Sequence, residues 1–360
     1  MKYFLALIIT FLLSAVLSII VKKLAIRFDI LDYPREERKI HKQPIPLLGG
    51  LAIFLAFSIV VIFYSQDILT SHILAKHLWG IVLGGGILML GGILDDKYNL
   101  RPRYQIIWPI SAALAVIIVG LGMKDITNPF GGIINLNTVS WNIFSWQGLP
   151  YKISLPADIL TFIWLMGMMY TTKFLDGLDG LATGISAIAA FLIFLLSIVT
   201  VYFLPEVALV AIIFVGACLG FLLFNFNPAK IFLGEGGSLF LGFMIGVLAI
   251  MAGSKIATTL LVMGIPILDV LWVIGRRIFW EKRAPFTADK KHLHYRFLEA
   301  GFSERRTVLT LYTISAAFGL LTLFLQSEGK FLALGVMIIL MIIIAIALVR
   351  ANNYKKRPTI

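Results

Sequence analysis

The chain has 360 residues, of which 59% are hydrophobic and only 14% are charged, and its mean hydropathy is +0.94. Because soluble domains are about 25% charged, this composition excludes a water-soluble enzyme and predicts a helical membrane protein. The formal net charge of +12 does not indicate nucleic acid binding, since the cytoplasmic loops of membrane proteins collect Lys and Arg. The single cysteine, Cys218, cannot form an internal disulfide bond.

Eleven apolar segments approach the length of about 20 residues that a membrane-spanning helix needs. The first is longer than the hydrophobic region of a signal peptide, so we expect it to be retained. The chain is therefore predicted to be an all-α, polytopic integral membrane protein with a single domain over residues 1–360. The expected spans are residues 3–21, 46–65, 78–94, 105–122, 157–174, 181–203, 207–224, 237–252, 256–275, 307–325 and 331–349.

The basic residues orient these spans. If the N-terminus lies outside the cell, 25 of the 31 Lys and Arg residues fall in inside segments. The positive-inside rule then predicts a cytoplasmic C-terminus. We expect the protein to lie in the inner (plasma) membrane, with a cytoplasmic active site. The outside segment 123–156, which carries Trp141 and Trp146, suits a small hairpin or an interfacial segment. The cytoplasmic loops are expected near residues 22–45, 95–104, 173–180, 225–238 and 276–306.

Acidic residues beside these spans gather on the predicted cytoplasmic side. Asp95 and Asp96 are adjacent at the end of the third span, and two adjacent carboxylates repel each other unless a cation or a shared proton relieves them. Mg²⁺ binds carboxylate oxygens together with substrate phosphates, so both residues are candidate catalytic groups and metal ligands. A solvated loop start before Lys97 is an equally good interpretation.

A second acidic pair, Asp176 and Asp179, follows the fifth span in the motif Asp-Gly-Leu-Asp-Gly. Their i,i+3 spacing lets both carboxylates face one way on a helical turn, and the glycines let a ligand approach closely. The motif thus marks both residues as candidate catalytic groups. The alternative is a pair of simple Asp-Gly turns.

A glycine-rich segment, Gly-Glu-Gly-Gly-Ser at residues 234–238, opens the eighth span. Such a turn at a helix N-terminus exposes backbone N–H groups that favour phosphate. Glu235 is a candidate metal ligand or only an acid in the first turn. Ser238 is a candidate substrate-binding residue or only an N-cap.

The long inner loop carries two histidines, His292 and His294, among many basic residues. With Arg277 and Arg296 nearby, the loop has the charge to clamp a diphosphate. The alternatives are a basic loop that faces lipid headgroups and, more weakly, a zinc site, which lacks a Cys or a third His close by.

These motifs, in this order and over nearly the whole chain, resemble the polyprenyl-phosphate N-acetylhexosamine-1-phosphate transferases, a family that includes the phospho-N-acetylmuramoyl-pentapeptide transferases. The Asp-Lys-x-His-Leu-His loop at 289–294, followed by Gly-Phe-Ser at 301–303, is similar to the branch that uses UDP-N-acetylglucosamine or a related UDP-N-acetylhexosamine. The other matching residues are Asp32, Pro34, Arg38, Lys39, His41, Pro44, Pro46, Gly49, Gly50, Asp95, Asp96, Asp176, Asp179, Phe232, Glu235, Ser238, Gly242, Pro266, Asp269, Pro285 and Arg296.

The resemblance implies transfer of N-acetylhexosamine 1-phosphate from a UDP-sugar to undecaprenyl phosphate, with release of UMP. This would be the first membrane step of a cell-envelope polysaccharide, such as teichoic acid or lipopolysaccharide. It also implies dependence on Mg²⁺, with Mn²⁺ as a substitute, and is compatible with a homodimer. The exact sugar and the polymer pathway are left open.

The resemblance suggests a role for each candidate residue. Glu235, with Asp95 or Asp96, would hold Mg²⁺, and Asp176 and Asp179 would position the nucleotide or sugar. The other aspartate of the pair at 95 and 96 would orient or deprotonate the lipid phosphate. His292 and His294 are candidate catalytic residues that, with Arg277, would steady the diphosphate and the leaving UMP. The remaining candidates for substrate binding are His41, Lys42, Lys173, Ser238 and Arg296.

Three residues depart from the family pattern. The family usually has Asn at the positions of Tyr170 and Lys173, and Asp at the position of Glu235. Lys173 is expected to pair with Asp176 or to contact a phosphate. These departures keep open a lipid-binding paralogue with altered specificity or lost catalysis. A transporter is less favoured because the acids lie at helix ends, and a CDP-alcohol phosphotransferase is set aside because no Ala-Arg follows Asp179-Gly180.

Overall fold

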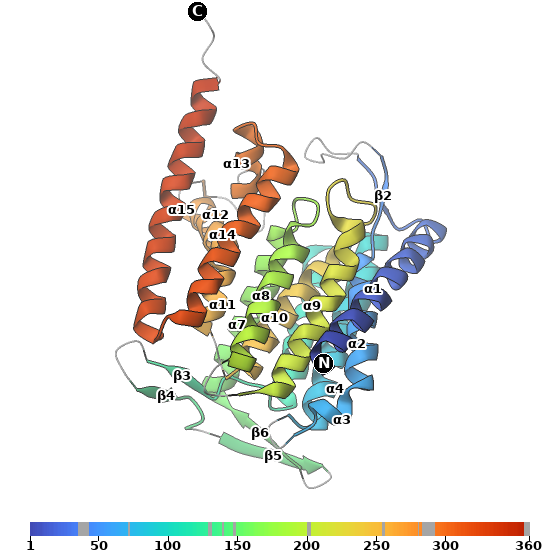
Figure 1. The fold of residues 1–360 in the computed structure, drawn as a ribbon. Coiled ribbons are helices and arrows are strands. Elements are labelled where there is room, and N and C mark those ends of the chain that lie inside the picture. Colours follow the sequence, from blue (N-terminus) through green and yellow to red (C-terminus); the bar gives the residue numbers. More distant parts are fainter. Residues whose placement is uncertain are drawn as a thin grey trace, which may run out of the picture.

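The computed structural model describes residues 1–34, 43–70, 73–128, 132–138, 140–146, 149–199, 203–253, 256–279, 281–282 and 292–355. Within these ranges the chain forms a bundle of helices with three small two-stranded sheets (Figure 1). The helices are α1 (Lys2–Arg27), α2 (Gly49–Phe63), α3 (Ser65–Ile68), α4 (Ala75–Tyr98), α5 (Pro102–Gln105), α6 (Ile107–Ile118), α7 (Leu155–Leu175), α8 (Leu181–Val199), α9 (Pro205–Asn225), α10 (Gly234–Met251), α11 (Ile256–Val262), α12 (Gly264–Phe279), α13 (Leu293–Glu299), α14 (Glu304–Phe324) and α15 (Ser327–Lys355). The strands are β1 (Leu31–Asp32), β2 (Ile45–Pro46), β3 (Asp125–Thr127), β4 (Ile133–Asn135), β5 (Ser140–Trp146) and β6 (Leu149–Ser154).

The expected all-α membrane fold is confirmed, but the count of eleven spans is not. Each expected segment coincides with helix in the structure. In the described part of the chain, however, only seven helices are long and apolar enough to cross a membrane, or eight if the bent pair α11 and α12 is one span. This pair turns by 79° at its break, while α2 and α6 are shorter than a full span. The number of membrane-spanning helices therefore stays a prediction beyond these seven or eight.

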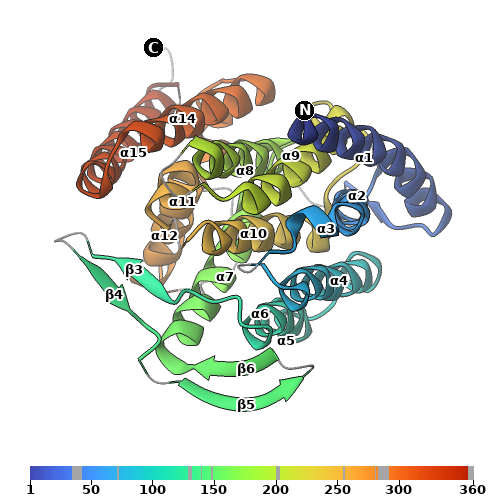
Figure 2. The same cartoon turned by 60° about the horizontal axis from the view of Figure 1, so that its bottom comes forward.

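Helix α10 lies at the centre of the bundle. Figure 2 shows it surrounded by α2, α4, α7, α8 and α9, and it packs against each of them. Nearly all of its residues are buried. By contrast, the apolar side chains of α1 and α15 are largely exposed, as expected for helices at the outside of a membrane bundle.

Glycines allow α10 to approach its neighbours closely. A methyl group added to Gly50 in α2 would overlap the Cα atom of Gly237, and one added to Gly92 in α4 would overlap the backbone of Gly236. Small residues at helix interfaces permit this backbone contact in membranes. The contacts fix the start of α10 between the start of α2 and the end of α4.

The two ends of the bundle differ. One end, which we call the strand end, carries the antiparallel hairpins β3–β4 and β5–β6 (Figure 1). These hairpins confirm the expectation for the segment 123–156. The other end, which we call the pocket end, carries the β1–β2 pair and α13. The N-terminus lies toward the strand end, where the Lys2 Nζ atom contacts the Asp67 Oδ1 atom at 2.7 Å, and α15 ends near the pocket end.

The glycine contacts predict a selective loss of stability. Gly50→Ala should lower the free energy of unfolding by about 2 kcal/mol, because the added methyl group forces α2 and α10 apart. Gly167→Ala in α7 is the matched control, since nothing lies within 4 Å of its added methyl group. Thermal unfolding in detergent should show a lower midpoint for the first variant only, and equal midpoints would contradict the packing role.

Candidate active site

A pocket of about 1400 Å³ opens at the pocket end of the bundle. Among the described residues, eight acidic and four basic side chains line it. Such an excess of carboxylates in one cavity needs protons or cations to offset their repulsion. The acidic residues are Asp29, Asp32, Asp95, Asp96, Asp176, Asp179, Glu235 and Glu304, and the basic residues are Lys22, Lys97, Lys173 and Lys230.

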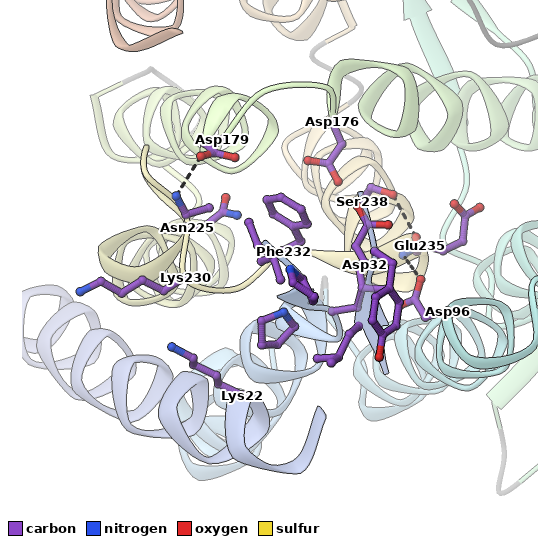
Figure 3. Close-up of a pocket in the computed structure, with 18 of the residues that line it drawn as sticks. Lys22, Asp32, Asp96, Asp176, Asp179, Asn225, Lys230, Phe232, Glu235 and Ser238 are labelled. Carbon is purple, nitrogen blue, oxygen red and sulfur yellow. Dashed lines mark hydrogen bonds between the residues drawn. The ribbon is translucent and has the colours of Figure 1, made fainter. Parts of the chain in front are cut away.

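Asp95 and Asp96 have different partners, although they are adjacent. The Asp95 Oδ1 atom accepts hydrogen bonds from the backbone N–H of Leu100 and from the Gln105 Nε2 atom, both at 2.9 Å. The Asp96 Oδ1 atom accepts one from the backbone N–H of Glu235 at 3.0 Å (Figure 3). Asp95 therefore holds the turn after α4, whereas Asp96 joins the end of α4 to the start of α10.

The conformation of Gly234 makes this junction possible. Its φ angle is +74°, a left-handed value that glycine adopts without steric cost. A methyl group added here would also overlap the Asp96 Oδ2 atom. A glycine at position 234 is therefore needed for the Asp96 carboxylate to lie this close to the start of α10.

The expectation that this segment opens its backbone to phosphate does not hold for Glu235, because its N–H group donates to Asp96. Gly236 and Gly237 pack closely against α4 and α2. Ser238 is not an N-cap, because it lies inside α10 and its hydroxyl donates to the Glu235 carbonyl at 3.0 Å. Ser238 does line the pocket, as expected for a substrate-binding residue.

Lys173 forms an ion pair with Glu235, and not with Asp176 as the sequence suggested. The pair joins the last turn of α7 to the first turn of α10. The Lys173 Nζ atom also lies 3.4 Å from the Gln105 Oε1 atom and 5.7 Å from the centre of the Tyr170 ring. The three residues that depart from the family pattern are therefore direct neighbours.

Asp176 and Asp179 do not act as one pair. Figure 3 shows Asp176 on the side of Glu235, and Asp179 near Asn225 on another side of the pocket. The Asp179 Oδ2 atom accepts from the Asn227 Nδ2 atom at 3.2 Å and from the backbone N–H of Ala229 at 2.8 Å. These bonds tie Asp179 to the loop between α9 and α10.

The Asp176 side chain is exposed and lines the pocket. The residue ends α7, and within the described part of the chain its side chain has no hydrogen bond. The pKa of Asp176 is raised to about 7, first because the surrounding protein removes water from the carboxylate and second because of the negative charges of Glu235 and Asp179. Since its side chain is accessible from the pocket, a cation that enters will lower this pKa by favouring the charged form.

The two histidines do not line the pocket, and His294 packs against the loop that does. The His292 Nδ1 atom lies 2.8 Å from the Asp269 Oδ2 atom, and the other Asp269 oxygen accepts from the Leu293 N–H at 2.8 Å. The His294 ring stacks on His292 at 5.6 Å, and burial lowers its pKa to about 4. His294 is therefore neutral near pH 7.

The His294 side chain supports the loop that carries Asp176. A methyl group added to Gly177 would overlap its Nε2 atom, which has no hydrogen-bond partner among the described residues. Neither histidine lines the pocket. Arg277, which is buried, and Arg296 do not line it either. Their roles toward substrate stay predictions, and His41 and Lys42 lie outside the described residues.

Some residues of the site escaped sequence analysis. Glu304 accepts hydrogen bonds from the backbone N–H of Asp179 at 3.0 Å and from the Asn227 Nδ2 atom at 2.7 Å. Nothing in its sequence context marks it as more than an acid at a helix start. Asp269 matched a motif, but its role in holding His292 depends on a contact between α12 and the start of α13 that sequence does not reveal.

Comparisons with known proteins show the family of the chain. The family described as Glycosyl transferase family 4 matches residues 78–253. The chain is 32% identical to the probable undecaprenyl-phosphate N-acetylglucosaminyl 1-phosphate transferase of Bacillus subtilis, over 95% of this chain and 90% of that protein. It is 32% identical to the decaprenyl-phosphate N-acetylglucosaminephosphotransferase of Mycolicibacterium smegmatis, over 91% and 83%. It is also 31% identical to a phospho-N-acetylmuramoyl-pentapeptide-transferase of Halalkalibacterium halodurans, over 89% and 97%.

The raised pKa of Asp176 predicts a pH dependence of stability. The unfolded carboxyl group titrates near pH ~4, so between that pH and about 7 the folded chain binds a proton that the unfolded chain lacks. Stability without divalent metal should therefore fall as pH rises through this window. Thermal unfolding in chelator should show this slope reduced in Asp176→Asn and retained in Asp67→Asn, and an unchanged slope in Asp176→Asn would contradict the assignment.

Proposed function

Because the chain belongs to glycosyl transferase family 4, we propose that it transfers N-acetylglucosamine 1-phosphate from UDP-N-acetylglucosamine to undecaprenyl phosphate, releasing UMP. The names of the relatives from Bacillus subtilis and Mycolicibacterium smegmatis support this donor and this class of acceptor. The observation that carries the proposal is the pocket itself. It is open to water, rich in carboxylates and lysines, and lies at the end of apolar helices, where a soluble nucleotide and a lipid phosphate can meet.

The chemistry is a single displacement at phosphorus. A lipid phosphate has a second pKa near ~6, so it is largely dianionic at neutral pH and already nucleophilic. Its oxygen attacks the phosphorus that bears the sugar, the bond from that phosphorus to UMP breaks, and a lipid diphosphate sugar forms. The protein must mainly align two anionic substrates and offset their charge. Asp176, open to the pocket, would orient the nucleotide or sugar, and Lys22 and Lys230 lie in its lining to meet phosphate oxygens.

The donor atoms of the pocket fit Mg²⁺. Carboxylate oxygens are the protein ligands that this ion prefers, and it usually takes only one or two of them together with substrate phosphates. This agrees with the described residues, where no three Asp, Glu, His or Cys side chains are placed to hold a metal alone. Asp96, with Asp95 beside it, would hold the ion, which would offset the charge of the diphosphate when bound. Mn²⁺ would substitute for it.

We also propose that the pocket end faces the cytoplasm in the inner membrane. The excess of Lys and Arg in the segments expected inside supports this orientation. UDP-sugars are cytoplasmic metabolites in the proposed reaction, so the pocket would then open toward its donor.

The proposed function is tested by UMP release. Purified chain, undecaprenyl phosphate and Mg²⁺ should release UMP with UDP-N-acetylglucosamine in preference to other UDP-sugars. Asp96→Asn should cut turnover at least about 100-fold, because the phosphate-bound cation loses a charged ligand. Asp67→Asn, a surface acid at the strand end, should stay within about twofold. A folded wild-type chain that releases no UMP from any UDP-sugar would favour a lipid-binding paralogue without catalysis.

Topology has its own test. The native Cys218 is buried and gives little background labelling. A cysteine introduced at Thr138, exposed at the strand end, should react with an impermeant thiol reagent added to intact cells. A cysteine at Glu299, exposed in α13, should react only after the membrane is opened. Labelling of the Glu299 position in intact cells would reverse the proposed orientation.

A further inference from the structure

We propose that the ammonium group of Lys173 is a resident cation of the pocket that holds Glu235 in an ion pair and thereby withdraws it from metal binding. This deepens the proposed function and rests on it only in treating the pocket as one that takes a divalent metal. The family resemblance implied that Glu235 is a metal ligand. The structure gives its carboxylate a different cation.

The contacts of Lys173 are specific. Its Nζ atom contacts the Glu235 Oε1 atom, and the side chains are 23% and 17% exposed, so bulk water screens the pair only in part. The Gln105 Oε1 atom is a second acceptor at 3.4 Å, and the Tyr170 ring lies 5.7 Å away, within the range of a cation–π interaction. Side chains from three helical segments therefore surround one ammonium group.

The backbone holds Lys173 in place. Next to it, the hydroxyl of Thr172 donates to the carbonyl of Ser238 at 2.7 Å. A methyl group added to Gly242 would overlap the carbonyl of Met168. These contacts fix the register of α7 against α10, and with it the approach of Lys173 to Glu235. The ion pair is thus a consequence of rigid helix packing as well as of attraction between two flexible side chains.

The pair is also connected to the aspartates. The Gln105 side chain that accepts from Lys173 donates to the Asp95 Oδ1 atom at 2.9 Å. The backbone N–H of Glu235 donates to the Asp96 Oδ1 atom at 3.0 Å. The lysine charge therefore lies within the same hydrogen-bonded group as both aspartates. A divalent ion bound at Asp96 would approach a neutral Lys173–Glu235 pair and not a free Glu235 carboxylate.

Mn²⁺ titration of the purified full-length chain in detergent, followed by electron paramagnetic resonance without substrate, tests this assignment. Lys173→Gln should raise Mn²⁺ affinity about tenfold or more, since it removes one positive charge close to the ion and frees Glu235. The double variant Lys173→Gln with Glu235→Gln keeps the net charge, and its affinity should stay within about threefold of wild type. Lys173→Arg retains the charge and should also resemble wild type.

Lys230→Gln is the matched control. It removes the same charge from the pocket lining, on the side away from Glu235 (Figure 3), and should raise affinity less than about threefold. A tenfold loss of affinity in the double variant would overturn the proposal, because Glu235 would then be a ligand. An unchanged affinity in a folded Lys173→Gln variant would overturn it as well.

The two proposals fail separately. Mn²⁺ binding is measured without nucleotide or lipid, so a chain that releases no UMP but shows the expected affinities would refute only the proposed function. Conversely, UMP release with a tenfold loss of Mn²⁺ affinity in the double variant would keep the function and refute the role of Lys173.

Discussion

The close approach of α10 to α2 and α4 is the constraint on which the pocket depends. Glycines at the contacts let the helix backbones touch, and this places the first turn of α10 beside the last turn of α4. Only then does the N–H group of Glu235 reach the Asp96 carboxylate. Replacing one of these glycines with a larger residue would separate the helices and break the hydrogen bond between Glu235 and Asp96.

The carboxylates of the pocket differ because their partners differ. Asp95 and Asp179 are committed to backbone and amide donors that shape the surrounding turns. Glu235 is paired with Lys173. Among the described residues, the Asp96 side chain accepts one backbone hydrogen bond and the Asp176 side chain accepts none, so both have oxygens left to meet a ligand. Neighbouring carboxylates of one acidic cluster therefore differ in how far the protein itself occupies them.

Support for the pocket comes from elements that do not line it. Asp269 in α12 holds both His292 and the backbone at the start of α13. The buried His294 ring fills the space against Gly177, next to Asp176. Ion pairs and imidazoles behind a site can orient its loops without contacting substrate, which explains why histidines in a motif need not face the cavity.

The sequence by itself determined the membrane fold class and the gathering of acidic motifs at one end of the helices, and it offered a hairpin as one of two alternatives for the segment 123–156. These features follow from composition, hydropathy and the spacing of residues along the chain. Sequence did not determine how many helices cross at full length, because apolar runs do not reveal the bend between α11 and α12. Only the tertiary structure decided the partners: Lys173 with Glu235, Asp179 with Asn227, and Asp269 with His292. The physical reason is that each pair joins separate helices or loops, whose meeting depends on tertiary packing. For Lys173 and Glu235 this packing is the register of α7 against α10, where Gly242 lies against the Met168 carbonyl.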